Sequence, residues 1–505
     1  MKNKAVLVFL FLSGFLFSQS KIAQIELEIH PNVEYQTIHN FGASDAWSAQ
    51  FVGKWSLDKK EAIADLLFST EKNADGTFKG IGLSTWRFNI GAGSAEQGVE
   101  SSIKDEWRRA EGFLNNDSSY NWNRQLGQQW FLKAAKERGV SSFIGFVNSP
   151  PVQFTKNNKA FSADGLSSNL KTSNYVKYGL FLKDVVRHFK DSLDLKFNFI
   201  SPFNEPQWDW KNGKQEGSPR NNDELSSATK KIDSVFKNYN LDTKLEVSEA
   251  GQIDYLTSIK KGKEHRSNQV EVFFNPTSDL YLGNLETVSQ KFAGHSYFTT
   301  WDISKLKTKR EEIKKKLIKY PNLEYWMTEY CILENNEEIR GKGKDLGMKT
   351  ALYVARLMHA DLTIANASAW HWWLAMTPYN YKDGLIYHDK NTEEGTFESS
   401  KLLWGLGNFS RFIRPQAKQI KIDYKGKNSL ENLEKGVLVS AYKNKDNSII
   451  IVAVNQKETA VQLNFKSTIK QVYVTDKDSD LKLIQHNADK KDVVITAKSI
   501  TTFIL

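Results

Sequence analysis

The sequence predicts an α/β fold: a (β/α)8 TIM barrel with an attached side β-sandwich domain that is built from both termini. Three observations lead to this prediction. Eight short apolar runs alternate with amphipathic stretches, polar and aromatic residues gather at the C-terminal ends of the runs, and the pattern changes after about residue 416. With 505 residues, 40% of them apolar, the chain is long enough for a large core or for two domains.

Eight runs are expected to form the strands of the barrel. They begin near residues 37, 83, 141, 196, 244, 291, 323 and 367. The runs are almost continuously apolar, as strands buried on both faces of a parallel sheet should be, and the helices between them favour a barrel. An open doubly wound sheet is the alternative. It usually shows a glycine fingerprint after its first strand, and the sequence FGASDAW at 41–47 is not one.

The stretches between these runs have helical periodicity. QQWFLKAAKERG ends at Gly139, and YVKYGLFLKDVVRHFK follows the third run. The lysine-rich KTKREEIKKKLIKY repeats Ile313, Leu317 and Ile318 at helical spacing, which indicates a solvated helix face. The net charge of +10 therefore does not predict a nucleic-acid partner.

The first twenty residues are typical of a secretory signal peptide. Lys2 and Lys4 precede the apolar run AVLVFLFLSGFLF, and the polar SQS follows it. The run is shorter than the ~20 residues that a membrane span needs, and no other segment is apolar enough to cross a bilayer. We therefore expect export to the periplasm, cell surface or medium. Cys331 is the only cysteine, so no intrachain disulfide can form.

The two ends of the mature chain share a strand pattern. IAQIELEIHPNVEYQTI near the N-terminus and GVLVSAYKNKDNSIIIVAVNQ near the C-terminus both alternate apolar and polar residues, as antiparallel strands do. The predicted domains are therefore the signal peptide at 1–20, N-terminal strands of the β-sandwich at 21–36, the barrel at 37–415, and the rest of the β-sandwich at 416–505.

Two glutamates carry the chemical prediction. HExxH, CxxC, GxSxG and phosphate-loop motifs are absent, so we predict no metal and no cofactor. Glu205 ends the fourth run and Glu329 ends the seventh, so their side chains can meet across the mouth of a barrel. Two converging carboxyl groups are what glycoside hydrolysis requires. Glu249, at the end of the fifth run, and Glu216, in the loop after Glu205, are competing candidates that either contact sugar or have structural roles.

The tryptophans support a sugar site. Many of them lie in or just after the expected strand ends, where broad apolar rings can stack on sugars. They are Trp47, Trp86, Trp208, Trp210, Trp326, Trp370, Trp372 and Trp373. Core packing is the competing explanation for several, and we assign Trp326 to it.

Four motifs in order, FGAS, SPFNEP, WMTEY and RFIRP at 411–415, resemble glycoside hydrolase family 30. The resemblance implies a retaining barrel enzyme with a side β-domain made from both termini. NEPQWDW followed by QEG at 215–217, and YKDGLIY at 381–387, look most like the endo-β-1,6-galactanase branch, which cleaves β-1,6-galactan side chains of arabinogalactan. One departure is Gln416, where the family often has glycine.

The resemblance also implies roles for individual residues. Glu205 matches the acid/base and Glu329 the nucleophile of the family. Asn204 matches the asparagine that binds the sugar 2-hydroxyl group, and His295 and Tyr297 match the pair that lines the pocket.

Further matches concern the surroundings of the nucleophile and the sugar. Arg87 matches an arginine that keeps the nucleophile ionised. Trp372 is the best match for an aromatic platform on the eighth strand, with Trp370 as the second choice. The weaker candidates for substrate contact are Asp45, Trp47 and Trp208.

We therefore predict a secreted retaining endo-glycoside hydrolase that cleaves β-1,6-galactan. Its predicted partner is its polysaccharide or oligosaccharide substrate. The same mechanism on xylan or β-1,6-glucan, or exo release of a terminal sugar, is the alternative. A non-catalytic carbohydrate-binding protein is a third possibility, but a pure binder needs neither glutamate. The sequence does not predict the oligomeric state.

Overall fold

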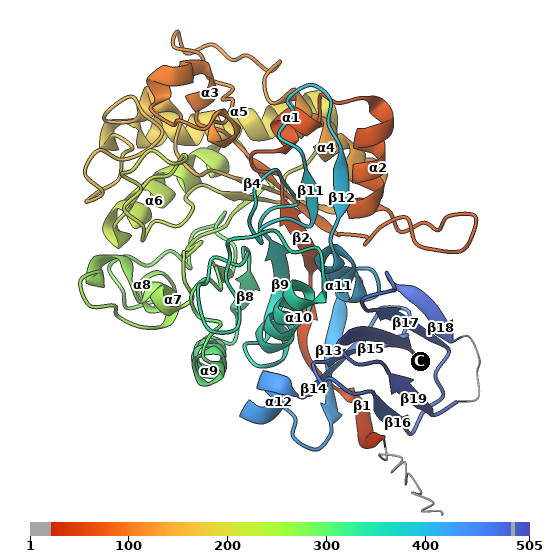
Figure 1. Ribbon diagram of the computed structural model, residues 1–505. Helices are drawn as coiled ribbons and strands as arrows, with labels where there is room; N and C mark the ends of the chain where they lie inside the picture. The colour runs from red at the N-terminus through yellow and green to blue at the C-terminus, as the bar shows by residue number, and fades with distance from the viewer. Residues whose placement is uncertain (1–21, 486–489) are drawn as a thin grey trace, which may run out of the picture.

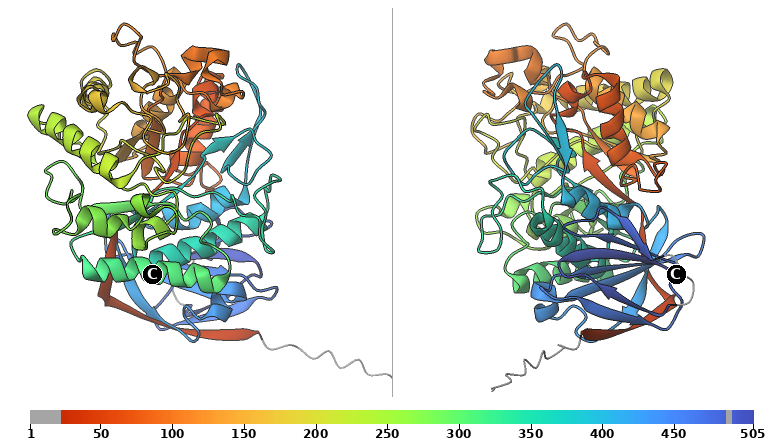
Figure 2. Two further views of the ribbon diagram at one scale, coloured as in Figure 1. Left: turned by 90° about the vertical axis from the view of Figure 1, so that its left-hand side faces the viewer. Right: turned by 45° about the vertical axis from the view of Figure 1, so that its right-hand side comes forward.

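The computed structural model describes residues 22–485 and 490–505, and the predicted signal peptide lies outside the described residues. A helix-covered barrel forms the larger part of the molecule, and a β-sandwich lies against one side of it (Figure 1). The other two views show the same arrangement, with the N-terminal strand running from the β-sandwich up into the barrel (Figure 2). The predicted fold class is confirmed.

An eight-stranded parallel sheet forms the barrel, in the order β6-β5-β4-β3-β2-β9-β8-β7. Parallel bridges from Leu245 to Val288 and from Ala250 to Gly294 join its two edges, so the sheet closes. Every strand lies within one of the eight predicted runs. The strands are β2 (Asn40–Ser44), β3 (Thr85–Asn89), β4 (Ser142–Phe146), β5 (Phe199–Ser201), β6 (Lys244–Leu245), β7 (Lys291–Gly294), β8 (Glu324–Met327) and β9 (Ala367–Trp372).

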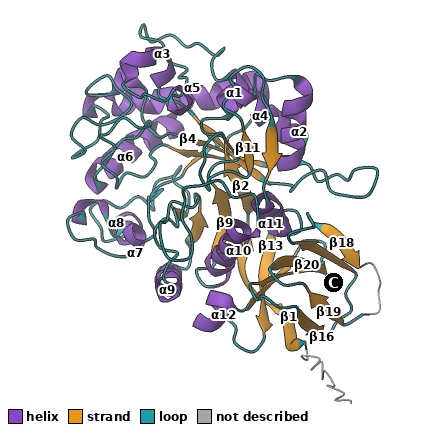
Figure 3. Ribbon diagram, viewed as in Figure 1, coloured by secondary structure: helices purple, strands orange, loops and turns teal. Residues whose placement is uncertain are grey.

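Helices surround this sheet (Figure 3). Helix α4 ends just before Gly139, whose φ of 86° suits glycine, and α6 begins with a capping box between Asn221 and Glu224. The lysine-rich stretch is helical, as predicted, and buries Ile313. The helices are α1 (Ala49–Val52), α2 (Leu57–Phe68), α3 (Ser94–Gln97), α4 (Leu126–Glu137), α5 (Tyr175–Leu193), α6 (Asn222–Asn238), α7 (Asp254–Thr257), α8 (Gln269–Phe274), α9 (Ile303–Lys319), α10 (Met348–Thr363), α11 (Lys401–Ser410) and α12 (Leu430–Lys435). None of those formed by the described residues is long and apolar enough to cross a membrane.

The described residues of the β-sandwich form nine strands, in the order β18-β17-β20-β15-β14-β13-β1-β16-β19. The N-terminal strand β1 pairs antiparallel with β13 and parallel with β16, so both ends of the chain build this domain. The strands are β1 (Ala23–Ile38), β13 (Ala417–Asp423), β14 (Val437–Lys443), β15 (Ile449–Asn455), β16 (Val461–Phe465), β17 (Gln471–Thr475), β18 (Lys482–Gln485), β19 (Asp492–Ile495) and β20 (Ser499–Ile504).

The RFIRP motif connects the two domains. The Arg411 guanidinium donates to the carbonyl groups of Ser69 and Gly80 and lies over the Phe78 ring. At the junction, Gln416 has a φ of 76°, and its N–H donates to the Ile38 carbonyl. This left-handed backbone explains why glycine suits the position.

A small three-stranded sheet follows the last barrel strand. It consists of β10 (Met376–Thr377), β11 (Ile386–His388) and β12 (Phe397–Ser399), and β11 pairs with both of the others. The YKDGLIY motif covers the end of the segment between β10 and β11 and the first two residues of β11, and part of that segment lines the cavity described below.

Candidate active site

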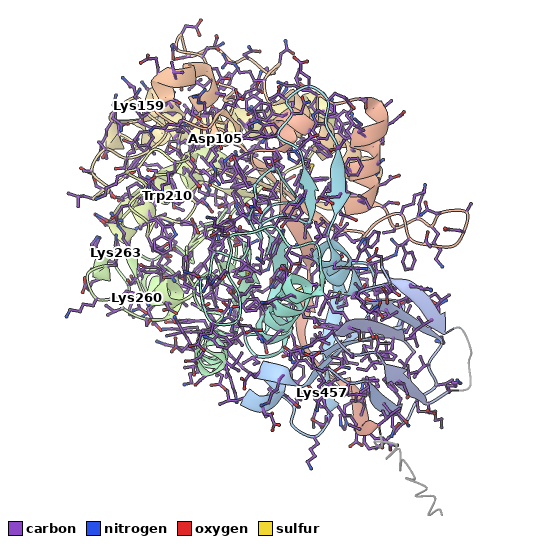
Figure 4. The ribbon with its side chains drawn as sticks, in the orientation of Figure 1. Asp105, Lys159, Trp210, Lys260, Lys263 and Lys457 are labelled. Carbon is purple, nitrogen blue, oxygen red and sulfur yellow. The ribbon has the colours of Figure 1, made fainter. Side chains whose placement is uncertain are left out.

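A cavity of about 810 Å³ lies where the C-terminal ends of the barrel strands meet. Three carboxyl groups line it, from Glu205, Glu329 and Asp383. Its aromatic lining comes from Trp47, Trp208, Trp210, Tyr297, Phe298, Trp373, Tyr379 and Tyr381. In Figure 4, Trp210 lies in the half of the molecule away from the β-sandwich, on the side where Asp105 also lies. Acidic groups and aromatic rings therefore share one hollow, as the sequence predicted.

The carboxyl groups of Glu205 and Glu329 are close together. One oxygen of each, together with one ring nitrogen of His295, forms a group whose atoms all lie within 4.8 Å of one another. The Glu205 backbone is held after β5 because its N–H donates to the Glu249 carbonyl at 3.0 Å and its own carbonyl accepts from Trp210 Nε1 at 2.9 Å. This backbone has a φ of 44°, which is uncommon for a residue with a side chain.

Glu329 is surrounded by donors. Arg87 Nη1 donates to its Oε2 atom at 3.0 Å, and the Tyr297 hydroxyl donates to its Oε1 atom at 3.1 Å. The Arg87 side chain is fully buried and reaches Glu329 from β3. Burial raises the pKa of Tyr297 well above its ordinary value, so its hydroxyl stays a donor. The two donors hold the Glu329 carboxyl group in one orientation.

His295 joins the acidic groups of the site. Its Nδ1 atom lies 2.9 Å from Glu205 Oε1 and 3.6 Å from Glu329 Oε1, and its Nε2 atom lies 2.8 Å from Glu249 Oε2. Burial opposes the charged imidazolium, yet the carboxylates of Glu329, Glu205 and Glu249 raise the pKa of His295 to about 10. The ring is therefore a cation near neutral pH and donates from both nitrogens.

The acid candidate has the electrostatic setting that proton donation needs. Burial raises the pKa of Glu205, and His295 partly offsets this rise. A carboxyl group that keeps its proton towards neutral pH can act as a general acid.

The trio of Glu205, His295 and Glu329 does not fit a metal ion. A metal ligand must offer a free imidazole lone pair. Both nitrogens of the His295 ring already contact carboxylates, and Arg87 supplies a second positive charge beside Glu329. We therefore assign the trio to proton and sugar chemistry.

Glu249 and Glu216, the competing glutamates, do not line the cavity. Glu249 is fully buried and accepts from His295 and from the Thr328 hydroxyl. Glu216 accepts from the N–H groups of Ala92 and Ser94 and so holds a loop. Both have structural roles in the free protein.

The tryptophan of β9 and its following turn that lines the cavity is one residue away from the predicted platform. Trp372 and Trp370 are fully buried, do not line the cavity, and donate to the Asp383 carbonyl and to Asp361 of α10 respectively. Trp370 and Trp372 lie on the same face of β9, because side chains alternate along a strand, and Trp373, the next residue, lines the cavity instead. The expectation for Trp372 and Trp370 was therefore wrong.

Of the remaining residues predicted to contact substrate, some line the cavity and others do not. Trp47, Trp208 and Asn204 line the cavity, and the Asn204 side-chain amide donates to Asn148 Oδ1 at 3.0 Å. Asp45 does not line it: the carboxyl is buried and accepts from the Asn89 N–H at 2.8 Å. Burial raises the pKa of Asp45 to about 8.

Sequence reasoning missed part of the lining. Arg108, Asn148, Lys342, Tyr379 and Asp383 lie outside the strands and α-helices, where apolar periodicity gives no signal. Asp383 lies in the YKDGLIY motif, which was the one signal that could have pointed to it.

Comparison with known proteins decides the family. The sequence profile described as O-glycosyl hydrolase family 30 matches residues 24–387, and that of the glycosyl hydrolase family 30 β-sandwich domain matches residues 416–503. The chain belongs to glycoside hydrolase family 30. Its barrel and its β-sandwich both match models of that family.

Individual relatives differ in their substrates. An endo-β-1,6-galactanase from Hypocrea rufa is 32% identical over 40% of this chain and 44% of its own length. A glucuronoxylanase from Bacillus subtilis is 31% identical over 36% of this chain and 39% of its own. The chain thus matches less than half the length of these curated relatives. A conserved exported protein from Bacteroides fragilis has a crystal structure with a TM-score of 0.90 and 33% identity, over 95% of this chain and 100% of that one.

Proposed function

We propose that this glycoside hydrolase is a secreted, retaining endo-enzyme that cleaves β-1,6-galactan side chains of arabinogalactan. One observation carries the mechanism: oxygens of Glu205 and Glu329 lie within 4.8 Å of each other on the wall of an aromatic cavity. Retaining enzymes hold their two carboxyl groups about 5–5.5 Å apart, whereas inverting enzymes need roughly 6.5–9.5 Å to admit a water molecule.

The first step forms a glycosyl-enzyme. Glu329 attacks the anomeric carbon while Glu205 donates its proton to the leaving oxygen, so one C–O bond forms as the glycosidic bond breaks. The His295 imidazolium donates to Glu205 Oε1, which leaves Oε2 to carry the transferred proton. Arg87 and Tyr297 hold the attacking carboxylate in place.

The second step releases the sugar. Glu205, now a carboxylate, removes a proton from a water molecule that attacks the anomeric carbon, and Glu329 leaves as a carboxylate. The configuration at the anomeric carbon is inverted twice and so is retained.

Two observations support the substrate and the endo mode. The Hypocrea rufa galactanase shares 32% identity with this chain, and the NEPQWDW and YKDGLIY motifs point to the same branch. A second hollow of about 600 Å³ adjoins the cavity at Tyr379 and Asn380, which gives a longer chain room beyond the reacting bond.

Export is proposed from the N-terminal sequence. Residues 1–20 have the charged start, apolar centre and polar exit of a signal peptide. The Bacteroides fragilis relative is described as an exported protein, which agrees with this proposal.

A substrate panel tests the proposal. The purified protein is incubated with β-1,6-galactan, β-1,6-glucan and xylan, and the products are separated. We expect oligosaccharides from galactan alone, and release from xylan alone would contradict the proposed substrate. The variants Glu205→Gln and Glu329→Gln should each lose activity by orders of magnitude while staying folded, whereas the surface variant Glu286→Gln should match the wild type. Near-normal turnover in either active-site variant would contradict the mechanism.

A further inference from the structure

Asp383 is a third acidic group in the cavity, and the two-glutamate mechanism does not use it. Only 6% of its surface is exposed, and its Oδ1 atom has no hydrogen-bond partner among the described residues. A buried polar atom without a partner is destabilising and rare. This atom belongs to a carboxyl group whose residue lines a binding cavity, so the group points to a missing ligand.

The backbone fixes Asp383 in this position. Its carbonyl accepts from the Leu374 N–H at 2.5 Å and from Trp372 Nε1 at 2.9 Å. At the next residue, Gly384, a Cβ atom would come within 2.4 Å of a Thr377 methyl carbon, so the segment packs tightly against β10. The carboxyl group is therefore presented to the cavity by a rigid support, which is what a selective contact requires.

Asp383 lies on the side of the cavity that contains the nucleophile. Cys331 also lines the cavity, and burial together with the nearby charge of Asp383 raises the pKa of its thiol well above the ordinary value. The Cys331 Sγ atom lies 3.9 Å from the Tyr297 hydroxyl, which in turn donates to Glu329. Asp383, Cys331 and Glu329 line the same cavity, so a sugar held at Glu329 can also reach the Asp383 carboxyl.

We propose that Asp383 accepts a hydrogen bond from a hydroxyl group of the sugar ring that Glu329 attacks, and that this contact helps to select the sugar. The proposal rests on the role of Glu329 given above, but not on galactan being the substrate. A site built to bind a hydroxyl group discriminates strongly against a sugar that lacks it, because the buried carboxyl is then left without a partner. Asp383 is thus a specificity-determining residue.

The test combines enzyme variants with modified substrates. Wild type and Asp383→Ala are assayed on aryl disaccharides of whichever glycan the wild type cleaves. In these disaccharides, each hydroxyl of the ring that carries the aryl group is replaced in turn by hydrogen. We expect one of these deoxy substrates to lower wild-type kcat/KM by about 10- to 100-fold. Asp383→Ala should show a similar loss on the full substrate and no further loss on that deoxy substrate.

Controls separate this role from a structural one. The free Asp383→Asn protein should melt no lower than the wild type near pH 7, because the change removes an unpartnered buried carboxyl. The exposed variant Asp279→Asn should match the wild type on every substrate. The proposal would be overturned if the loss from Asp383→Ala and the loss from the missing hydroxyl were additive in free energy for every deoxy substrate. It would also be overturned if Asp383→Asn had a lower melting temperature and normal kinetics. Cleavage of xylan or β-1,6-glucan in place of galactan would contradict the proposed substrate alone, and the Asp383 test would then use that glycan. Cleavage of none of the three would contradict both.

Discussion

Replacing His295 with asparagine removes a buried positive charge that lies against the carboxyl groups of Glu205, Glu249 and Glu329. The pKa of His295 is raised from 6.5 to about 10, and at 1.36 kcal/mol per pKa unit this difference corresponds to about 5 kcal/mol. Removing one partner of a buried ion pair typically costs about 3–5 kcal/mol, which agrees with that figure. We therefore expect the asparagine variant to lose about 3–5 kcal/mol of unfolding free energy at pH 7.

The loss should depend on pH in a defined direction. Because folding raises the pKa of His295, its contribution is complete below pH 6.5 and disappears as the pH rises through about 10. Urea unfolding of both proteins at pH 7 and pH 10.5 gives two differences in free energy. Titrating groups that do not contact His295 cancel within each difference. The difference should shrink towards zero at pH 10.5.

His188 provides a matched control. It lies on α5, stacks on Trp122, and has its pKa lowered by burial, so it is neutral at both pH values. The cost of His188→Asn should therefore be the same at pH 7 and pH 10.5. A cost of His295→Asn that is likewise unchanged between the two would refute the charged imidazolium.

The same substitution should change the kinetics. His295 is a group that lowers the pKa of Glu205 against the effect of burial, so its removal raises that pKa further. A hydrogen bond to a charged group contributes about 1.5–3 kcal/mol, which predicts that the alkaline limb of the kcat/KM profile moves up by about 1 to 2 pH units. An unmoved limb would refute the role of Glu205 as the acid.

Three further predictions concern the platform, a buried acid and the side domain. Trp373→Ala should lower kcat/KM by roughly 10- to 100-fold through lost stacking, whereas Trp370→Phe should leave it unchanged; equal effects would contradict the assignment of the platform. Asp45 has its pKa raised from 3.8 to about 8, so its ionisation lowers the unfolding free energy as the pH rises from about 4 to 8. In urea unfolding across that range, Asp45→Asn should reduce this loss of unfolding free energy by up to about 5 kcal/mol. A loss identical to that of the wild type would contradict the raised pKa. Deleting residues 416–505 removes both strand partners of β1 and the surface that packs on α11, so the remaining chain should aggregate; a monomeric, cooperatively melting product would show that the barrel is independent.

The sequence predicted the parts of the fold that depend on patterns of apolar residues. All eight barrel strands lie in their predicted runs, and β1 joins the C-terminal strands because both alternate apolar and polar residues. Glu205 and Glu329 could be paired because parallel barrel strands end at one face.

What the sequence could not predict depends on local backbone geometry. Trp373 lines the cavity and Trp372 does not, because the side-chain direction at a strand end is set by the face and by the turn that follows. Asp45 and Glu249 lie at strand ends as Glu205 does, yet hydrogen bonds turn them into the protein. Asp383 reaches the cavity from a loop, where periodicity carries no information.

The stereochemistry of hydrolysis tests the central claim most directly. Proton NMR of the first-formed product from a β-linked oligosaccharide reports the configuration at the new reducing end before mutarotation. The short distance between the carboxyl oxygens of Glu205 and Glu329 predicts that the β-anomer appears first. Initial release of the α-anomer would contradict the double displacement by these two residues.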